Sequence, residues 1–356
     1  MTDATSRLSG RAAEKIWLNS YPPAVAAEIA SYPHPSLGSL FESSCATYAD
    51  RLAFSSMGRG MTFRELEEQS RKVGAWLQAK GLVKGDRVAV MTPNILQNPV
   101  AVYGILRAGF TVVNVNPLYT PRELQHQLVD AGAKAIIVLE NFAGTVQQVL
   151  PNTPVKHVIV ATMGDMLGLK GHIVNFVVRK VKKLVPAWSI PGHTSFKRVL
   201  AEGARQPLKP VDVTASDVAF LQYTGGTTGV SKGATLTHAN LLANKQQIAM
   251  WLEAAFELKG RPEVMTFICA LPLYHIFALT VNSLMGIATG SHNVLIANPR
   301  DIPAFVKELQ NHKAHIFPGL NTLFNALMNN PDFKNLDFSS LLLVLGGGMA
   351  VQRPVA

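Results

Sequence analysis

The chain has 356 residues, 48% of them hydrophobic and 16% charged, which is typical of a globular protein and excludes a disordered one. With Cys45 and Cys269 as the only cysteines, a disulfide scaffold and a cysteine metal site are also excluded, and a reducing compartment is indicated. The first residues lack the apolar run of a signal peptide, so we expect a cytoplasmic protein. The net charge of +10 suits nucleic acid, an anionic membrane or a polyanionic substrate. No nucleic-acid-binding motif accompanies that charge, so no nucleic-acid partner is expected.

Strands and helices alternate through the first half of the sequence. Thr120, Pro121 and Glu123 supply an N-cap, a first helical residue and a capping box, which together mark the start of a helix. Continuous runs of β-branched residues between helices predict a parallel sheet that is covered on both faces. The expected elements are strands at 86–92, 110–116 and 133–140 and helices at 96–109 and 120–132.

A second series of α/β elements follows an irregular segment at 161–215 that is rich in glycine, proline and basic residues. We expect two α/β subdomains, residues 1–210 and 211–356, each built on a largely parallel sheet. The expected elements of the second subdomain are strands at 217–222, 264–272, 293–297, 314–319 and 341–348 and helices at 237–256, 276–288, 298–312 and 320–330.

One block, Val264–Pro299, contains no Asp, Glu, Lys or Arg. A bilayer crossing needs about 20 consecutive apolar residues, and here Pro272, Asn282 and Gly290 interrupt the run. The block is therefore predicted to be the core of a globular domain.

The stretch "YTGGTTGVSKG", residues 223–233, follows a predicted buried strand. Ligands of open α/β sheets bind at the carboxyl ends of the strands, and closely spaced glycines let backbone N–H groups converge on an anion. Lys232 adds a positive charge, and hydroxyl groups add further donors. Neither the Walker A pattern nor GxGxxG is present, so the stretch predicts a different polyphosphate loop. The alternative is a flexible surface hairpin.

The stretch "YTGGTTGVSKGATLTH" resembles the phosphate loop of adenylate-forming enzymes, the superfamily of acyl-CoA synthetases, and the wider sequence is similar to bacterial long-chain fatty-acid–CoA ligases. The resemblance covers essentially the whole chain. It implies that ATP and a long-chain fatty acid give acyl-AMP and pyrophosphate, and that CoA then displaces AMP, with Mg²⁺ on the phosphates. The stretches that carry the narrower resemblance are "IWLNSYPPAVAAEI", "VVNVNPLYTPRELQHQL", "IVNFVVRKVKKLVPAW", "ALPLYHIFALT", "NPRDIP", "GLNTLFNAL" and "LDFSSL".

The same resemblance implies site residues. A lone histidine in an apolar stretch is more often a core residue, but His275 of "PLYHIF" matches the family histidine beside the acyl carbonyl. Lys232 and His275 are thus the expected catalytic residues, and Tyr274, His275 and Ile276 the expected substrate contacts. The expected ATP-binding residues are Tyr223, Thr224, Gly225, Gly226, Thr227, Thr228, Gly229, Val230, Ser231, Lys232, Gly233, Ala234, Gly347, Gly348 and Met349.

Other family elements are missing from the sequence. The chain stops at "MAVQRPVA", just after a strand that ends in three glycines and should lead into a helix. The family glutamate that serves Mg²⁺, the ribose-binding aspartate and the small C-terminal domain with its lysine would all come later. No metal ligand is therefore expected here, and we expect residues 1–356 alone to have little or no ligase activity. The alternative is a noncatalytic nucleotide- or acyl-binding module.

The stretch "IVNFVVRKVKKLVPAW" (173–188) predicts an amphipathic helix that Pro186 ends. The helical wheel places Arg179, Lys182 and Lys183 opposite the apolar residues, and Lys180 beside them. We expect reversible contact with an anionic membrane, and hence a cytoplasmic protein peripherally associated with the inner membrane. The alternative is a helix packed on the protein with a solvated basic face. The expected apolar face consists of Ile173, Val174, Phe176, Val177, Val181, Leu184 and Val185.

Overall fold

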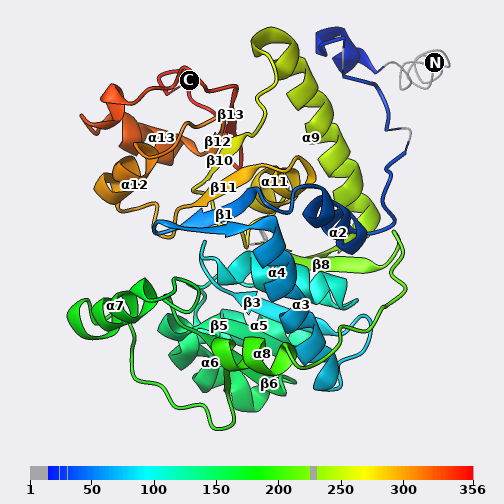
Figure 1. Ribbon diagram of the computed structural model, residues 1–356, viewed down its shortest axis with the longest axis vertical. Helices are drawn as coiled ribbons and strands as arrows, with labels where there is room; N and C mark the ends of the chain where they lie inside the picture. The colour runs from blue at the N-terminus through cyan, green and yellow to red at the C-terminus, as the bar shows by residue number, and fades with distance from the viewer. Residues whose placement is uncertain (1–14, 24, 30, 225–230, 356) are drawn as a thin grey trace, which may run out of the picture.

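The computed structural model describes residues 15–23, 25–29, 31–224 and 231–355 of the chain. These residues form two largely parallel sheets with helices on both faces of each (Figure 1). The α/β class that the sequence predicts is thereby confirmed, because long apolar strands can be buried on both faces only when helices cover both.

One sheet has seven strands. All neighbouring strands in it are parallel except the antiparallel pair β8 and β9. Its strands are, in order across the sheet, β7 (Thr194–Ser195), β6 (His157–Ala161), β5 (Ala133–Leu139), β3 (Arg87–Met91), β4 (Thr111–Asn114), β8 (Val218–Thr224) and β9 (Lys232–Thr237).

Helices α3, α4 and α8 cover one face of this sheet, and α5 and α6 cover the other. Helices α3 and α4 approach closely at Gly104, which has no side chain to keep them apart. A Cβ there would lie only 2.6 Å from the Ser70 carbonyl oxygen, so only glycine fits. The expected capping box of α5 is confirmed, since Thr120 and Glu123 each bind the other's backbone N–H. The helices are α3 (Phe63–Ala79), α4 (Gln97–Arg107), α5 (Pro121–Asp130), α6 (Ala143–Val149) and α8 (Phe196–Gly203).

The other sheet has six strands, which are parallel apart from the antiparallel hairpin of β1 and β2. Its strands are, in order across the sheet, β13 (Leu343–Gly346), β12 (Ile316–Gly319), β10 (Thr266–Cys269), β11 (His292–Leu295), β1 (Leu52–Ser56) and β2 (Arg59–Thr62).

Helices α12 and α13 pack on one face of the six-stranded sheet, and α9 packs on the other beside the helical run 276–288. That run is helical throughout but changes to a π-helix, η5, in its middle. Helix α2 begins at the N-cap Ser36 and belongs to the core cluster that joins the two sheets. The helices are α2 (Leu37–Thr47), α9 (His238–Lys259), α10 (Ile276–Ala278), η5 (Leu279–Leu284), α11 (Met285–Ala288), α12 (Ile302–Leu309) and α13 (Asn321–Met328).

The expected division into residues 1–210 and 211–356 does not follow the sheets. Strands β1 and β2 come from the first range but belong to the six-stranded sheet, and β8 and β9 come from the second range but belong to the seven-stranded sheet. The segment 161–215 also holds regular structure: α7 (Lys170–Phe176) overlaps the helix expected at 173–188, whereas β7 and α8 were not predicted. The order of elements along the sequence does not give this division, because each sheet contains strands from both halves of the chain.

The charge-free block is core, as expected. It contains β10, the helical run 276–288 and β11, and most of its side chains are buried. Of the helices in the described ranges, none combines the length and apolarity that a bilayer crossing requires.

Candidate active site

The two ends of the glycine loop lie at the carboxyl edge of the seven-stranded sheet. Strand β8 runs parallel to β4, and β9 returns antiparallel to β8 with Thr224 opposite Lys232. The Ser231 hydroxyl donates to the Thr224 carbonyl at 2.9 Å and closes the base of the loop. The Ser231 carbonyl accepts from His126 Nε2 at 2.9 Å, so helix α5 holds the same point. The sequence correctly predicted that this stretch follows a buried parallel strand.

Six of the expected ATP-binding residues lie outside the described part of the chain: Gly225, Gly226, Thr227, Thr228, Gly229 and Val230. Lys232 lies exposed at the first position of β9, and no ion pair of it is found among the described residues. Gly233 faces Tyr223, and a Cβ there would lie 2.9 Å from the tyrosine ring. The Tyr223 hydroxyl donates to Asp130 on α5, so this hydrogen bond ties the end of β8 to helix α5. Ala234, also exposed, pairs with Gln222 of β8.

His275 is the N-cap of α10, directly after the loop that follows β10. Its Nδ1 accepts from the Phe277 backbone N–H at 3.3 Å. Partial burial lowers the pKa of His275, so the ring is neutral near pH 7. A neutral imidazole that accepts at Nδ1 carries its proton on Nε2, which is then available to donate to a ligand.

A chain of amide side chains joins the glycine loop to the His275 loop. Gln222, the residue before Tyr223 in β8, donates from Nε2 to the Tyr274 carbonyl at 2.8 Å. Its Oε1 accepts from Asn114 of β4 at 3.1 Å, and Gln127 of α5 donates to the Asn114 carbonyl at 2.8 Å. Because all three amides are buried, their hydrogen bonds hold the two loops in a fixed relation.

Asn94 fixes the same loop from the other side. It follows β3, is 3% exposed, and donates from Nδ2 to the carbonyls of Cys269 at 2.9 Å and Leu271 at 2.8 Å. Its Oδ1 accepts from the Leu273 backbone N–H at 2.9 Å. Asn94, just after a strand of the seven-stranded sheet, therefore holds in place the backbone between β10 of the other sheet and His275.

The glycine turn after β13 meets the helix that His275 begins. A Cβ at Gly347 would lie 2.8 Å from the Phe277 ring, so the absence of a side chain lets the turn pack against α10. Gly348 has a φ of +76°, a conformation that favours glycine, and Met349 is exposed. The structure thus places His275 between the ends of the glycine loop, which Gln222 joins to the Tyr274 carbonyl, and the glycine turn after β13, which packs on Phe277.

An apolar groove opens beside His275. Its volume is about 930 Å³, and Phe277, Thr280 and Val281 line it on the side of the histidine. Strand β13, helix α9 and the N-terminal segment supply the remaining walls. Ile276 is half-buried next to Phe277 and does not line the groove.

No cluster of three or more His, Cys, Asp or Glu side chains suited to a metal ion occurs within the described ranges.

The surface segment expected at the membrane differs in part from its prediction. Helix α7 continues as a π-helix over Val177–Val181 and ends before Pro186. It ends early because Lys183 adopts a φ of +49° and the Leu184 backbone N–H bonds the Val178 carbonyl at 2.9 Å. Val174, Val177 and Val185 are partly buried. The exposed apolar side chains are Leu169, Ile173, Phe176, Val181 and Leu184.

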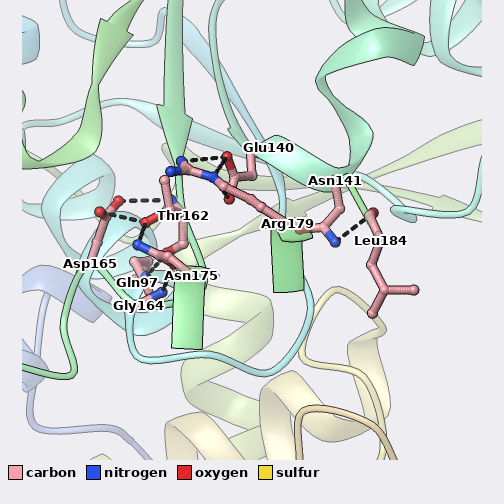
Figure 2. A network of polar contacts seen from close by, with 9 residues as sticks. All are labelled: Gln97, Glu140, Asn141, Thr162, Gly164, Asp165, Asn175, Arg179 and Leu184. Carbon is pink, nitrogen blue, oxygen red and sulfur yellow. Dashed lines mark hydrogen bonds and ion pairs between the residues drawn. The ribbon is translucent and has the colours of Figure 1, made fainter. Parts of the chain in front are cut away.

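Arg179 is exposed, as the helical wheel predicts, but its guanidinium also pairs with a buried carboxylate. Figure 2 shows it reaching Glu140, which is 2% exposed, with contacts of 2.7–3.1 Å. The Asn141 side chain donates to the Leu184 carbonyl at 2.9 Å and holds the far end of the segment. The remaining basic residues, Lys180, Lys182 and Lys183, are exposed.

Sequence reasoning missed Asn94, Asn114, Gln127 and Gln222. Asn114 and Gln222 are polar residues at or near the end of an apolar strand, Asn94 follows such a strand, and Gln127 lies on the buried face of α5. That position was the available signal, because carboxyl-terminal strand ends gather at one edge of a parallel sheet.

Comparison with known proteins gives a consistent match. The family described as AMP-binding enzyme matches residues 41–356. A long-chain-fatty-acid–CoA ligase of Salmonella typhimurium is 55% identical over 345 residues, which are 96% of this chain and 61% of that protein. The ligase of the same name from Haemophilus influenzae is 51% identical, with the same two shares covered. The chain thus spans about three fifths of the length of these relatives.

The fold also matches solved structures. The crystal structure of a long-chain-fatty-acid–CoA ligase from Archaeoglobus fulgidus superposes with a TM-score of 0.74 at 24% sequence identity. The match covers 92% of this chain and 60% of that one. At this identity the likeness establishes the shared fold.

Proposed function

The chain belongs to the AMP-binding enzyme family, and from this we propose that its protein activates long-chain fatty acids with ATP and transfers the acyl group to CoA. One observation carries the proposal: the ends of a phosphate loop, a neutral histidine and an apolar groove meet at one edge between the two sheets. A phosphate site next to a long apolar groove suits a substrate that has a carboxylate at one end and an alkyl chain at the other. The names of the similar ligases agree with this chemistry.

In the first proposed step, a carboxylate oxygen of the fatty acid attacks the α-phosphorus of ATP. The bond to the β-phosphate breaks, and pyrophosphate leaves with the electron pair. Two anions must approach each other, so the enzyme must offset their repulsion and the charge that develops on the leaving group. Lys232 supplies a positive charge at the loop, and Thr224 and Ser231 add hydroxyl groups there.

His275 would position the acyl group in both steps. Its Nε2–H can donate to a carboxylate or carbonyl oxygen, because Nδ1 is already engaged by the Phe277 N–H. In the second step the CoA sulfur attacks the acyl carbon, the bond to the phosphate oxygen breaks, and AMP leaves as the thiol loses its proton. The groove beyond Phe277 would hold the alkyl chain away from water.

Mg²⁺ is the metal that a triphosphate substrate ordinarily brings. The proposed roles of this chain's described residues are to bind and orient the phosphates and the acyl group.

The decisive experiment replaces Lys232 with alanine in the full-length product of the reading frame. We expect a higher KM for ATP and slower fatty-acid-dependent exchange of pyrophosphate into ATP, with fatty-acid saturation nearly unchanged. The matched control is Lys334→Ala, an exposed lysine away from the loop, which should leave both parameters unchanged. Unchanged ATP kinetics with poorer fatty-acid saturation in Lys232→Ala would overturn the assignment of Lys232 to ATP.

We also propose that the enzyme is a cytoplasmic protein that binds peripherally to the inner membrane through α7 and the π-helix after it. Exposed Ile173 and Phe176 would enter the headgroup region, and Lys180, Lys182 and Lys183 would attract anionic lipid. Arg179 is left out because its guanidinium pairs with Glu140.

The test replaces the three lysines with glutamine and measures co-sedimentation with vesicles of phosphatidylglycerol and phosphatidylethanolamine. At roughly 1 kcal/mol for each basic residue, binding should weaken about a hundredfold. The control replaces three exposed basic residues on and after α8: Lys197, Arg205 and Lys209. Equal co-sedimentation of the two triple variants would show that this segment is not the membrane contact.

A further inference from the structure

The described part of the N-terminal segment, residues 16–23 and 25–29, lies across one side of the apolar groove; we call it the strap. Seven strap residues line the groove, and the opposing walls come from α9, from Phe277–Val281 and from two residues of β13. The strap residues in this wall are Trp17, Tyr21, Val25, Ala26, Ala27, Glu28 and Ile29.

The strap is held by side chains and not by a sheet. No strand among those described pairs with it. The Tyr21 ring packs edge-on against Trp251 of α9, with the ring centroids 5.2 Å apart, and Val25 is buried. An ion pair joins Lys15 to Glu28. The 3₁₀ turn Ile16–Ser20 buries none of its own residues. The strap thus has few anchors, and Tyr21 with Trp251 is the main one.

The exposed side chains of the strap and of α9 form an aromatic rim. Trp17 is 53% exposed, Trp251 is 43% exposed and Tyr21 is 36% exposed. Singly exposed apolar residues need no explanation, but three aromatic residues that line one groove are a built apolar surface. Such rings give a large contact area at a low cost in conformational entropy.

We infer that the strap is the outer wall of the alkyl-binding groove and that Tyr21 and Trp251 set the preference of the enzyme for long acyl chains. This inference rests on the proposed function, because it assigns the groove to the alkyl group of that substrate. A short chain ends near Phe277, between walls that belong to the folded core. A long chain extends farther along the groove, where the strap and α9 are the covering elements.

The chemistry gives a graded expectation. Burial of one methylene group stabilises binding about fourfold, so removing the cover from two or three methylenes should weaken long-chain binding at least tenfold. Short-chain acids that do not reach the strap should be affected little. The signature of the strap is therefore a change in chain-length selectivity, which a general loss of stability would not produce.

The first test compares Tyr21→Ala and Trp251→Ala in the full-length product, with octanoate and hexadecanoate as substrates. We expect kcat/KM for hexadecanoate to fall about tenfold and that for octanoate to change less than about twofold. The matched control is Trp188→Ala, which removes another aromatic side chain in an edge-on pair, at 4.9 Å from His193 and outside the groove. This control should have the same ratio of kcat/KM for hexadecanoate and octanoate as the wild type.

The second test needs no variant. Hexadecanoate with a photoreactive diazirine at its terminal carbon is incubated with the wild-type enzyme and ATP, irradiated, and mapped by mass spectrometry. We expect labelled peptides to contain residues of the strap or of α9 near Trp251. The inference is overturned if both variants are active with an unchanged ratio of kcat/KM for the two acids and if the label lies outside the strap and α9. That result would leave the proposed function standing. Absence of fatty-acid-dependent pyrophosphate exchange in the wild-type enzyme would instead remove the proposed function, and the inference with it.

Discussion

Replacement of Asn94 should show whether the hydrogen bonds of its amide group or its shape contributes more to the stability of the fold. Its amide satisfies the carbonyls of Cys269 and Leu271 and the N–H of Leu273, and all four residues are buried. Asn94→Ala leaves the Leu273 N–H unpaired, and it leaves the carbonyls of Cys269 and Leu271 with only the Ile296 N–H and the weak Cys269 thiol donor. Each buried group left unsatisfied costs about 1–3 kcal/mol, and partial relaxation of the loop recovers some of it. We expect a loss of about 3 kcal/mol in the free energy of unfolding.

Asn94→Asp should be worse than alanine although it is the closer match in shape. An aspartate can still accept from Leu273, but it turns an oxygen towards the two carbonyls that Nδ2 now serves. It also buries a negative charge with no cation close by among the described salt bridges. The expected order of stability is wild type, then Asn94→Ala, then Asn94→Asp.

The assay is urea denaturation of the full-length protein, followed by the fluorescence of its tryptophans, with pyrophosphate exchange measured on the folded fraction. The control is Asn141→Ala, which removes one hydrogen bond to the Leu184 carbonyl far from His275. Because the loop before His275 shifts, both Asn94 variants should raise the KM for fatty acid more than that for ATP. An Asn94→Asp protein as stable as wild type would refute the reasoning that the amide group, and not its shape, holds the loop.

Three further outcomes follow from packing and charge. Gly233→Ala should lower the free energy of unfolding by about 1–3 kcal/mol in urea titrations, since its new Cβ would lie 2.9 Å from the facing tyrosine ring; an unchanged midpoint would show that the ring moves freely. Burial lowers the pKa of His238 to about 4, so the stability that its neutral ring contributes is present above about pH 6.5 and is lost as the pH falls towards 4. That contribution is on the order of 3 kcal/mol, and His238→Gln should flatten this part of the pH profile of stability. Arg179→Gln should lower the melting temperature more than Lys180→Gln, because it leaves buried Glu140 without its cation; equal melting temperatures would contradict this.

The local features of the fold were predictable from the sequence because local chemistry determines them. The capping box at Thr120 lies where the pattern places it, and the helix expected at 237–256 begins directly after its N-cap Thr237. The apolar runs 86–92 and 110–116 contain β3 and β4. The pairing of the strands was not predictable in this way, since β1 finds its parallel neighbour β11 far along the chain. Long-range pairing depends on packing between helices and sheets that no short window of sequence contains.

The candidate site divides in the same way. The glycine loop and His275 stand out because glycine clusters and a polar residue in an apolar run are visible locally. Gln222 and Asn94 act through backbone groups more than 50 residues away, so their residue type alone could not reveal their partners. The helical wheel predicts the exposure of Arg179 correctly, but it could not reveal that the buried carboxylate of Glu140 binds the guanidinium.

The exchange of strands between the two sheets has a consequence for biosynthesis. Phe54 of β1 pairs in register with Asn293 of β11, 239 positions later. At about 5–20 residues per second, a ribosome needs roughly 10–50 s to make the intervening chain. For that time the β1–β2 hairpin, whose side chains are mostly buried in the finished protein, has no partner sheet to cover it. We therefore expect that slowing translation between β2 and β11 lengthens the exposure of this hairpin and increases aggregation.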